Sequence, residues 1–448
     1  MGKKSLTILF DKYLFVWFYA GIMIYNYFII RLISLDTFLA IRLHWFRYIY
    51  TAWAFLIVIC DIVTKRLFKS KVKIFWGIAF LIAVLSVVFQ PNPRNMMQIQ
   101  QLITFGILTY ICVSAALDAG ADKIKYLLLS LGKQTAIIIT VLCILSIIVA
   151  VLMLAKVQLP TWVLSLNEGG IKPDPLAHSF FLLPDDFGRY RGLFIYQTEA
   201  GNACYITILL DLFLLEQKKL SKWFCALSIP SCVIMIMLAD CRESFISLAL
   251  ILLFVFLFYL IKKTGAKKAL LTIGSICFIG LLGVVAVVIL YVRKIMAEGD
   301  LTFIQALNTF SSSRIKLWTV GWNAFLERKI IGWGWLWNNE QVGAKFTDIF
   351  PNHHNFIINL LAWTGITGLI GFFAALIYSL KEIYKNRFDI AKDHSKWLFV
   401  LIVCVLVQAL LDICLFGEDS HFETVYFWIC LGYLIYLRYP HSENIETH

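Results

Sequence analysis

The stretch TAIIITVLCILSIIVAVLMLA, Thr135 to Ala155, decides the fold class. It carries no charged residue over the roughly 20 positions that an α-helix needs to cross a bilayer. SFISLALILLFVFLFYLI, Ser244 to Ile261, is a second run of this kind. The chain has 448 residues, 60% hydrophobic and 15% charged, whereas soluble domains are about half apolar and a quarter charged. Because the runs are continuous and do not alternate as barrel strands do, the sequence predicts an all-α, polytopic transmembrane bundle.

Hydropathy along the chain predicts about twelve spans. They fall near 13–33, 46–63, 74–90, 99–117, 134–155, 203–215, 223–239, 244–261, 270–292, 355–380, 397–416 and 422–437. The chain then divides into N-terminal transmembrane helices (1–155), a first outer loop (156–202), central helices with an outer arginine hairpin (203–292), a second outer loop (293–354), and C-terminal helices with a short cytoplasmic tail (355–448). The apolar part of the first span is too long for a cleaved signal peptide, so we expect a transmembrane helix there.

The formal net charge of +12 would suit a nucleic-acid partner, but the position of the basic residues argues against one. Lysine and arginine gather in alternate short connections, such as TKRLFKSKVK (64–73), EQKKLSKW (216–223) and KKTGAKK (262–268). Cytoplasmic loops carry this excess of positive charge. With an even number of spans, both termini and the basic loops face the cytoplasm, and the two long loops face outward.

The second outer loop contains a predicted amphipathic helix within SSSRIKLWTVGWNAFLERK (311–329). Ile315, Trp318, Trp322 and Phe325 recur near the helical spacing, so we expect a helix that lies on the outer surface of the membrane. Arg314 opens this helix behind three serines, which offer caps and backbone N–H groups to an anion. The alternative is a solvated arginine on a polar helix face.

Two further arginine sites lie on the predicted outer face. Arg242, in MLADCRESFIS (237–247), stands in a very short hairpin, where a cation needs water, a carboxylate or an anionic ligand. The alternative is a snorkelling side chain paired with Asp240 or Glu243. Arg189 and Arg191, in RYRGLF (189–194), either contact a ligand or anchor the end of the sixth span.

The tenth span begins in PNHHNFIINLLAWTGITG (351–368), with two histidines at its mouth. His354 is a natural proton acceptor, because the pKa of imidazole is about 6.5. We expect His353 to hydrogen-bond the start of the helix and Asn355 to orient His354 or cap the helix. Gly365 and Gly368 predict that a neighbouring helix approaches closely.

Metal and cofactor sites are not predicted. The chain has neither HxxxH nor HExxH, the spacings that bring two histidines to one metal. Its 11 cysteines are scattered through the apolar spans without a CxxC pair, so we expect them to pack as small hydrophobic residues.

Arginines and a histidine beside a bilayer favour one chemistry. Guanidinium forks bind phosphate through two hydrogen bonds and keep their charge when half-buried, and a lipid diphosphate carries its phosphates at that depth. Glycosyl transfer from such a donor requires stabilisation of the leaving diphosphate and removal of a proton from an acceptor hydroxyl. Arginine suits the first task and histidine the second.

Three segments together resemble the O-antigen ligase and O-antigen polymerase superfamily of bacterial envelope glycosyltransferases. They are ADCRESFISLAL (239–250), SSSRIKLWTVGWNAFLERKIIGWG (311–334) and HHNFIINLLAWTGITGLIG (353–371), and the resemblance covers roughly Arg189 to Phe372. It implies a fold of the GT-C type in the bacterial inner membrane, with the active site on the periplasmic face. It also implies inverting, metal-independent transfer of a glycan from undecaprenyl diphosphate to an acceptor glycan or lipid A–core, alongside other polysaccharide assembly proteins.

The resemblance also implies roles for individual residues. Arg242 and Arg314 would hold the diphosphate, and His354 would activate the acceptor hydroxyl. The family usually has His-x-His-Asn where this chain has two adjacent histidines and an asparagine, and the register of the asparagine favours His354. Further candidates for substrate contact are Arg189, Arg191, His353 and Asn355.

Several functions fit this pattern. Two sizeable outer loops that both carry arginines favour a polymerase, which joins repeat units, over a ligase, which attaches finished glycan to lipid A–core. A protein O-oligosaccharyltransferase would need additional outer-domain sequence. A transporter or flippase of lipid-linked sugar would place ionisable residues in the middle of spans and show repeat symmetry, whereas no repeat is evident here and Asp61, Asp118, Asp211 and Asp412 lie near span ends.

Overall fold

The computed structural model describes residues 11–25, 49, 52–66, 70–89, 96–155, 157, 190, 192–194, 197–299, 301–311, 313–335, 353–411 and 422–437. Over these residues every regular element is a helix, which confirms the predicted all-α class. Six of the described helices are long and apolar enough to cross a membrane: α5, α7, α9, α10, α11 and α15. The remaining predicted spans and the GT-C assignment stay predictions.

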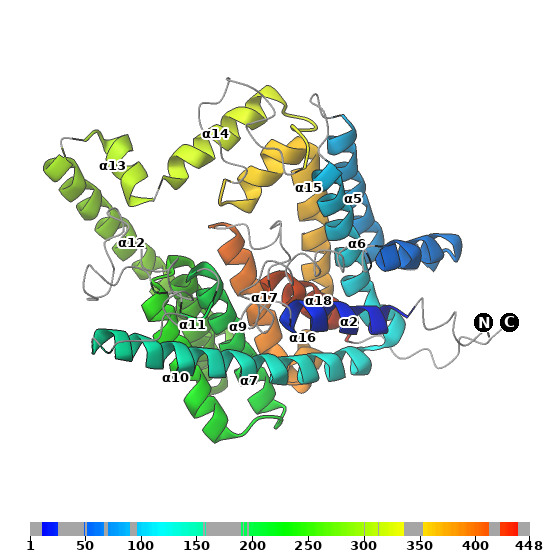
Figure 1. Cartoon of the computed structure of the whole chain (residues 1–448), viewed down its shortest axis with the longest axis horizontal. Coiled ribbons are helices and arrows are strands. Elements are labelled where there is room, and N and C mark those ends of the chain that lie inside the picture. The colour runs from blue at the N-terminus through cyan, green and yellow to red at the C-terminus, as the bar shows by residue number, and fades with distance from the viewer. Residues whose placement is uncertain are drawn as a thin grey trace.

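Helices α13 and α14 lie within the predicted second outer loop (Figure 1). The helices are α2 (Lys12–Tyr25), α5 (Lys71–Val88), α6 (Met96–Ala119), α7 (Ala121–Leu154), α9 (Gln197–Glu216), α10 (Lys222–Ala239), α11 (Arg242–Thr264), α12 (Ala266–Gly299), α13 (Phe303–Phe310), α14 (Arg314–Glu327), α15 (Phe356–Lys385), α16 (Arg387–Lys392), α17 (Lys396–Ala409) and α18 (Phe422–Tyr436), with a further apolar helix at Ala52–Val63. α9 therefore begins before the span predicted at 203–215, and α12 extends beyond 292.

Two helices form the centre of the bundle. Residues 200–211 of α9 and 425–436 of α18 are all buried, and α9 contacts α7, α10, α11, α17 and α18. In its most apolar window α9 has a mean hydropathy of only 1.3, yet 78% of that window is buried. Because protein rather than lipid surrounds it, α9 can carry Asn202, Thr207 and Asp211 inside the bundle.

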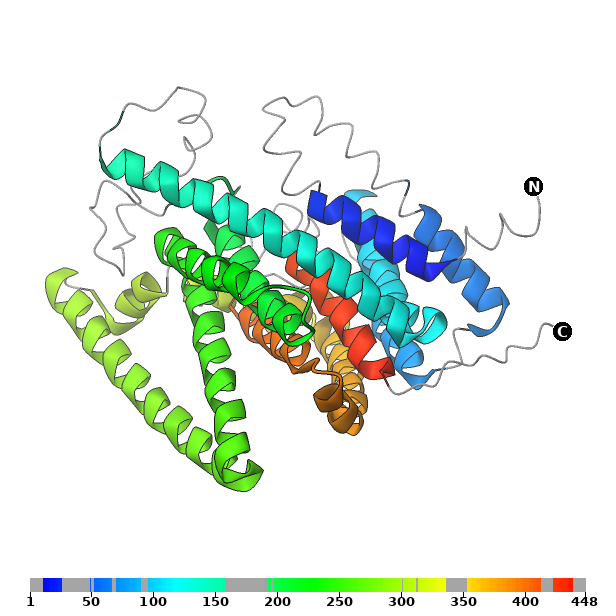
Figure 2. The same cartoon turned by 90° about the horizontal axis from the view of Figure 1, so that it is seen from below.

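α12 lies at the edge of the molecule. It contacts α11 and α13 and diverges from the bundle in both views (Figures 1 and 2). Leu271, Phe278, Ile279 and Leu290 are exposed along it, at 76%, 62%, 67% and 65%. A helix with such an exposed apolar surface is suited to contact with lipid tails.

A cluster of charges joins four helices at one end of the bundle. The ammonium of Lys12 in α2 pairs with Asp61, in the helix Ala52–Val63, and with Asp118, at the end of α6. Lys73 of α5 lies 3.3 Å from Asp118, and the Tyr110 hydroxyl donates to Asp61 at 2.6 Å. Two cations therefore meet two carboxylates, and removing one partner of such a buried group typically costs about 3–5 kcal/mol.

Ion pairs and helix directions distinguish the two ends of the central bundle. At one end Lys396 pairs with Glu216 at 2.8 Å, and Lys125 pairs with Asp393 at 2.5 Å. These residues belong to connections predicted to be cytoplasmic. α9, α11 and α15 begin at the opposite end, where α10 and α17 finish. The arginine hairpin and the histidine pair therefore lie at a common end of the bundle.

α15 is broken at Gly365, and a loop fills the break. Gly365 has φ 67° and ψ −167°, outside the helical region. Backbone groups of residues 329–334 replace the missing helical hydrogen bonds: Trp333 N donates to Ala362 O and Gly334 N to Trp363 O, both at 2.9 Å, while Ile366 N donates to Lys329 O at 2.8 Å. A lipid-embedded helix needs such replacements, because the hydrocarbon offers no hydrogen bonds.

The prediction that a helix approaches Gly365 was therefore wrong in one respect. The backbone of the loop approaches it, and a Cβ atom at Gly365 would stand 2.3 Å from Ile330 O. On the other side of the contact Gly332, at φ 74°, would place a Cβ 2.5 Å from the carbonyl carbon of Trp363. Two glycines are needed because two backbones meet here.

Gly365→Ala should destabilise the protein. A non-glycine residue in this conformation costs about 1–3 kcal/mol, and the added methyl group also overlaps the Ile330 backbone. We expect a lower midpoint of thermal unfolding, measured by fluorescence-detected size exclusion in detergent. Gly274→Ala is the control, since its Cβ meets nothing within 4 Å in α12 and alanine is the better helix former by about 1 kcal/mol. Equal midpoints for the two variants would contradict the described break.

Candidate functional site

The arginine hairpin is a two-residue turn. α10 ends at Ala239, Asp240 adopts the left-handed conformation at φ 46°, and Cys241 is the N-cap of α11. Arg242 is consequently the first residue of α11 and is half-buried at the end of the bundle. The short hairpin that the sequence predicted is present, and the position of Arg242 at a membrane boundary stays a prediction.

The next residue joins the two predicted arginine sites. Glu243 is buried, and its carboxylate forms an ion pair with the guanidinium of Arg314, the first residue of α14. The Glu243 side chain is 5% exposed and that of Arg314 is 24% exposed. Arg242 and Arg314 are 72 positions apart in the sequence, and this ion pair brings α14 directly to the start of α11.

α14 forms where the sequence predicts it, but a different face of the helix packs against the protein. Leu317, Gly321 and Ala324 are buried, whereas Trp322 is 46% exposed and its ring lies 5.2 Å from that of Phe325, tilted by 50°. Of the predicted apolar face, Trp322 is exposed, and Ile315, Trp318 and Phe325 are half-buried. The buried face follows Arg314 at intervals of three and four residues.

Gly321 allows α14 to pack closely against His353 and the start of α15. A Cβ atom at Gly321 would lie 2.7 Å from Cδ2 of His353 and 2.4 Å from Cγ2 of Ile358. Only a residue without a side chain allows this contact between α14 and the start of α15. Seven residues of helix separate Gly321 from Arg314, which corresponds to about 10 Å along the axis.

His353 is held in one orientation. It is fully buried, and Asn359 Oδ1 accepts from its backbone N–H at 3.1 Å and lies 2.8 Å from its Nδ1. Burial lowers the pKa of His353 below its ordinary value, the hydrogen bond to Asn359 opposes this shift, and the charge of His354 adds to it. The expected role of His353 at the helix start is confirmed.

His354 and Asn355 complete the mouth. His354 has φ 47°, is only half-buried, and stands immediately before the helix. Asn355 caps α15, since its Oδ1 accepts from Ile357 N at 2.9 Å and Ile358 N at 3.1 Å. Its Nδ2 donates to Leu410 O at 2.8 Å. The amide of Asn355 thus joins the start of α15 to the end of α17. His354, beside it, has a left-handed backbone conformation, and strained positions of this kind are found at functional sites.

A buried polar layer lies under the arginine hairpin. Asn202 of α9 bonds to Glu423 of α18 and to Gln408 of α17, and it accepts from Ser244 Oγ at 3.3 Å. Gly201 makes room for this layer, because its Cβ would lie 2.2 Å from Ser244 Oγ. The layer ties the start of α11 to three neighbouring helices and so fixes Arg242 and Glu243.

Two predicted site residues lie outside the described residues: Arg189 and Arg191. Tyr190, between them, is buried, and its hydroxyl donates to Ser146 O at 2.8 Å. The proposed contact of these arginines with a donor stays a prediction.

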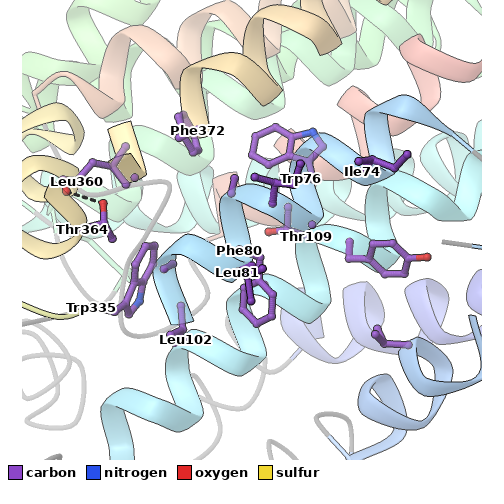
Figure 3. A pocket seen from close by; sticks show the side chains of 18 of the residues that line it. Ile74, Trp76, Phe80, Leu81, Leu102, Thr109, Trp335, Leu360, Thr364 and Phe372 are labelled. Atoms are coloured by element: carbon purple, nitrogen blue, oxygen red, sulfur yellow. Dashed lines mark hydrogen bonds between the residues drawn. The ribbon is translucent and has the colours of Figure 1, made fainter. Parts of the chain in front are cut away.

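An apolar cavity of about 400 Å³ lies beside α15 (Figure 3). Its walls come from α5, α6, α15 and the helix Ala52–Val63, with Trp335 at one end. Trp76 lies toward Phe372 of α15, with the two ring centroids 5.4 Å apart, and Leu360 and Thr364 line the cavity on the same helix (Figure 3). On α15 the lining residues run from Leu360 to Phe372, about 18 Å along a helix.

Three cysteines meet deeper in the bundle, which the sequence spacing did not indicate. The sulfurs of Cys143 in α7, Cys204 in α9 and Cys232 in α10 all lie within 4.8 Å of one another, and those of Cys143 and Cys204 are 3.4 Å apart. Among the described residues this is the group best suited to hold a metal, since soft cations such as Cu(I) accept thiolates. All three side chains are buried.

Sequence reasoning also missed Gly321, Asn359 and the ion pair between Glu243 and Arg314. Gly321 follows Arg314 by seven residues and Asn359 follows Asn355 by four, spacings that put each pair on one helix face. The sequence does not show which helix packs against each of these faces, and for that reason the contacts could not be predicted.

These features define an all-helical, multi-pass membrane protein with arginines and an imidazole gathered at one end of its bundle. Residues 226–373, from α10 to the middle of α15, match the family model described as O-antigen ligase. The match covers about a third of the chain and includes all three segments on which the resemblance rests. Over these residues the chain is similar to the O-antigen ligase family, which supports the resemblance to the O-antigen ligase and polymerase superfamily of glycosyltransferase-like membrane enzymes. No curated protein matches the chain.

The buried imidazole should make stability depend on pH. The unfolded chain takes up a proton as the pH falls below about 6.5, while burial keeps His353 neutral to lower pH. Stability is therefore lost on acidification, and the midpoint of thermal unfolding should fall more between pH 7.5 and 5.5 in the wild type than in His353→Gln. His394→Gln is the control, since His394 is exposed in a different turn. The same acid sensitivity in His353→Gln and the wild type would argue against a buried neutral imidazole.

Proposed function

We propose that the protein is a glycosyltransferase that moves a glycan from undecaprenyl diphosphate to a sugar hydroxyl, as an O-antigen or surface polysaccharide polymerase. The active site would lie on the periplasmic face, with both chain termini in the cytoplasm. The observation that carries the proposal is the link between Arg242 and Arg314 through Glu243. The contact of α14 with His353 supports it from the other side.

The chemistry follows from these groups. The acceptor oxygen attacks the anomeric carbon, and its proton passes to the imidazole of His354. The bond between that carbon and the diphosphate oxygen breaks on the opposite face, so the configuration inverts. Arg242 and Arg314 stabilise the charge that develops on the departing diphosphate, a task for fixed cations in a site partly shielded from water. The reaction as written needs no metal ion.

The cavity beside α15 supports a lipid-linked donor. Its lining is apolar, and its first residue on α15 is Leu360, about 6 Å along the helix from Phe356, which follows His353 by three residues. A polyprenyl chain in this cavity would keep its diphosphate near the arginine end of the bundle. Removing the tail from water is worth about 25 cal/mol for each Å². The bilayer offers the tail a similar apolar environment, so the cavity would add little affinity. Its main effect would be to position the diphosphate of the donor.

Removal of the charged groups should abolish transfer. We expect Arg242→Ala, Arg314→Ala and His354→Ala to insert in the membrane and to lose more than 99% of transfer, because each removes a group that acts in the transition state; stabilising groups of this kind contribute about 10²–10³-fold each. Lys267→Ala, in an exposed residue at the start of α12, is the control. Long-chain polysaccharide on gels from all three variants would exclude the mechanism.

A second experiment distinguishes polymerase from ligase, which share this site. A strain that lacks a polymerase carries single repeat units on its lipid A–core, whereas a strain without a ligase accumulates long chains not attached to core. Electrophoresis of envelope glycans from a deletion strain reads out the difference, and we expect single units. A flippase would instead move labelled lipid-linked sugar across vesicles that contain the purified protein.

Filling the cavity should impair long donors selectively. A Cβ atom at Gly77 meets nothing within 4 Å, and Gly77 lines the cavity, so Gly77→Phe places a ring where a lipid tail would lie. We expect the KM for an undecaprenyl-linked donor to rise at least fivefold and that for a short-chain analogue to change little. Gly283→Phe, at an exposed and open position in α12, is the control. Equal effects on both donors would remove the cavity from the proposal.

A further inference from the structure

One carboxylate stands inside the cationic site. Glu243 pairs with Arg314 and follows Arg242 directly in the chain. An anion bound by Arg314 would therefore lie close to this carboxylate. A charge in that position opposes the binding of a diphosphate.

The surroundings of Glu243 stabilise its carboxylate as an anion and fix its position. Its side chain is 5% exposed, and it lies in the first turn of α11, where the partial positive charge of the helix start stabilises an anion. Cys241 Sγ donates to it at 3.4 Å. The buried polar layer around Asn202 and Ser244 fixes the same turn from below. Because solvent hardly reaches the carboxylate, salt screens its field weakly.

We propose that Glu243 is a built-in counter-ion that limits the affinity of the site for the diphosphate and so allows the spent carrier to leave. This inference rests on the proposed function. Two arginines alone present two positive charges to the leaving group, and the tight binding that results would slow turnover. With Glu243 the three groups carry a net charge of one. Coulomb attraction across a few ångströms near a protein surface is large enough for one buried charge to change affinity at least tenfold.

The test compares diphosphate binding by charge variants of the full-length protein in detergent. Glu243→Gln keeps the size of the side chain and an acceptor for Arg314, but removes the charge. We expect it to bind farnesyl diphosphate about tenfold more tightly by isothermal titration. In transfer assays both KM and kcat should fall, because product leaves more slowly. A purely structural role for Glu243 predicts weaker binding, which would overturn the proposal, as would unchanged binding.

A second comparison holds even if Glu243→Gln alone folds poorly. In Arg314→Ala the carboxylate has lost its cation and repels the ligand, so the double variant Glu243→Gln with Arg314→Ala should bind farnesyl diphosphate more tightly than Arg314→Ala. The opposite order, or equality, contradicts the inference. Glu216→Gln is the matched control, a carboxylate that pairs with Lys396 at the opposite end of the bundle, and we expect less than a threefold change.

The two proposals fail separately. If the wild type binds farnesyl diphosphate with the predicted order of variants but transfers no glycan, the proposed function falls, and what remains is the effect of Glu243 on diphosphate affinity. If the wild type transfers glycan and the order is absent, only the counter-ion is disproved. A wild type that binds no farnesyl diphosphate also disproves it.

Discussion

The backbone contact between residues 329–334 and the break in α15 is the constraint on which the rest of the site depends. A membrane-embedded helix cannot leave carbonyl and N–H groups without partners, and here a loop from another part of the chain supplies them. The same contact fixes the end of α14, because the loop begins immediately after that helix. Gly332 and Gly365 permit it, since each would place a Cβ inside the opposing backbone.

α14 is consequently clamped at both ends. Its first residue, Arg314, is bound to the start of α11 through Glu243, and its last turn leads into the loop that fills α15. Between these anchors Gly321 rests against His353. A helix that is otherwise at the periphery of the bundle (Figure 1) thus connects the arginine hairpin to the histidine mouth. Beneath this site, the core helices α9, α17 and α18 are joined to one another through the hydrogen bonds of Asn202.

Much of this could be predicted from single residues and their spacing. Uncharged runs predicted helices such as α7 and α11, the short turn predicted the position of Arg242, and Asn355 predicted the start of α15. What could not be predicted depends on which partner packs where. Helical periodicity in α14 showed two faces but not that the glycine face would meet the protein, and Gly365 indicated a close approach but not a broken helix. The cavity and the three-cysteine group likewise involve helices far apart in the sequence.

The paired charges of Lys12, Asp61, Lys73 and Asp118 have a consequence for how the protein meets an energised membrane. A transmembrane voltage does work of about 2.3 kcal/mol for each elementary charge moved through 100 mV. Two ammonium groups and two carboxylates cancel, so the field exerts almost no net force on this part of the bundle. A change of membrane potential therefore does little net work when the four charges move together.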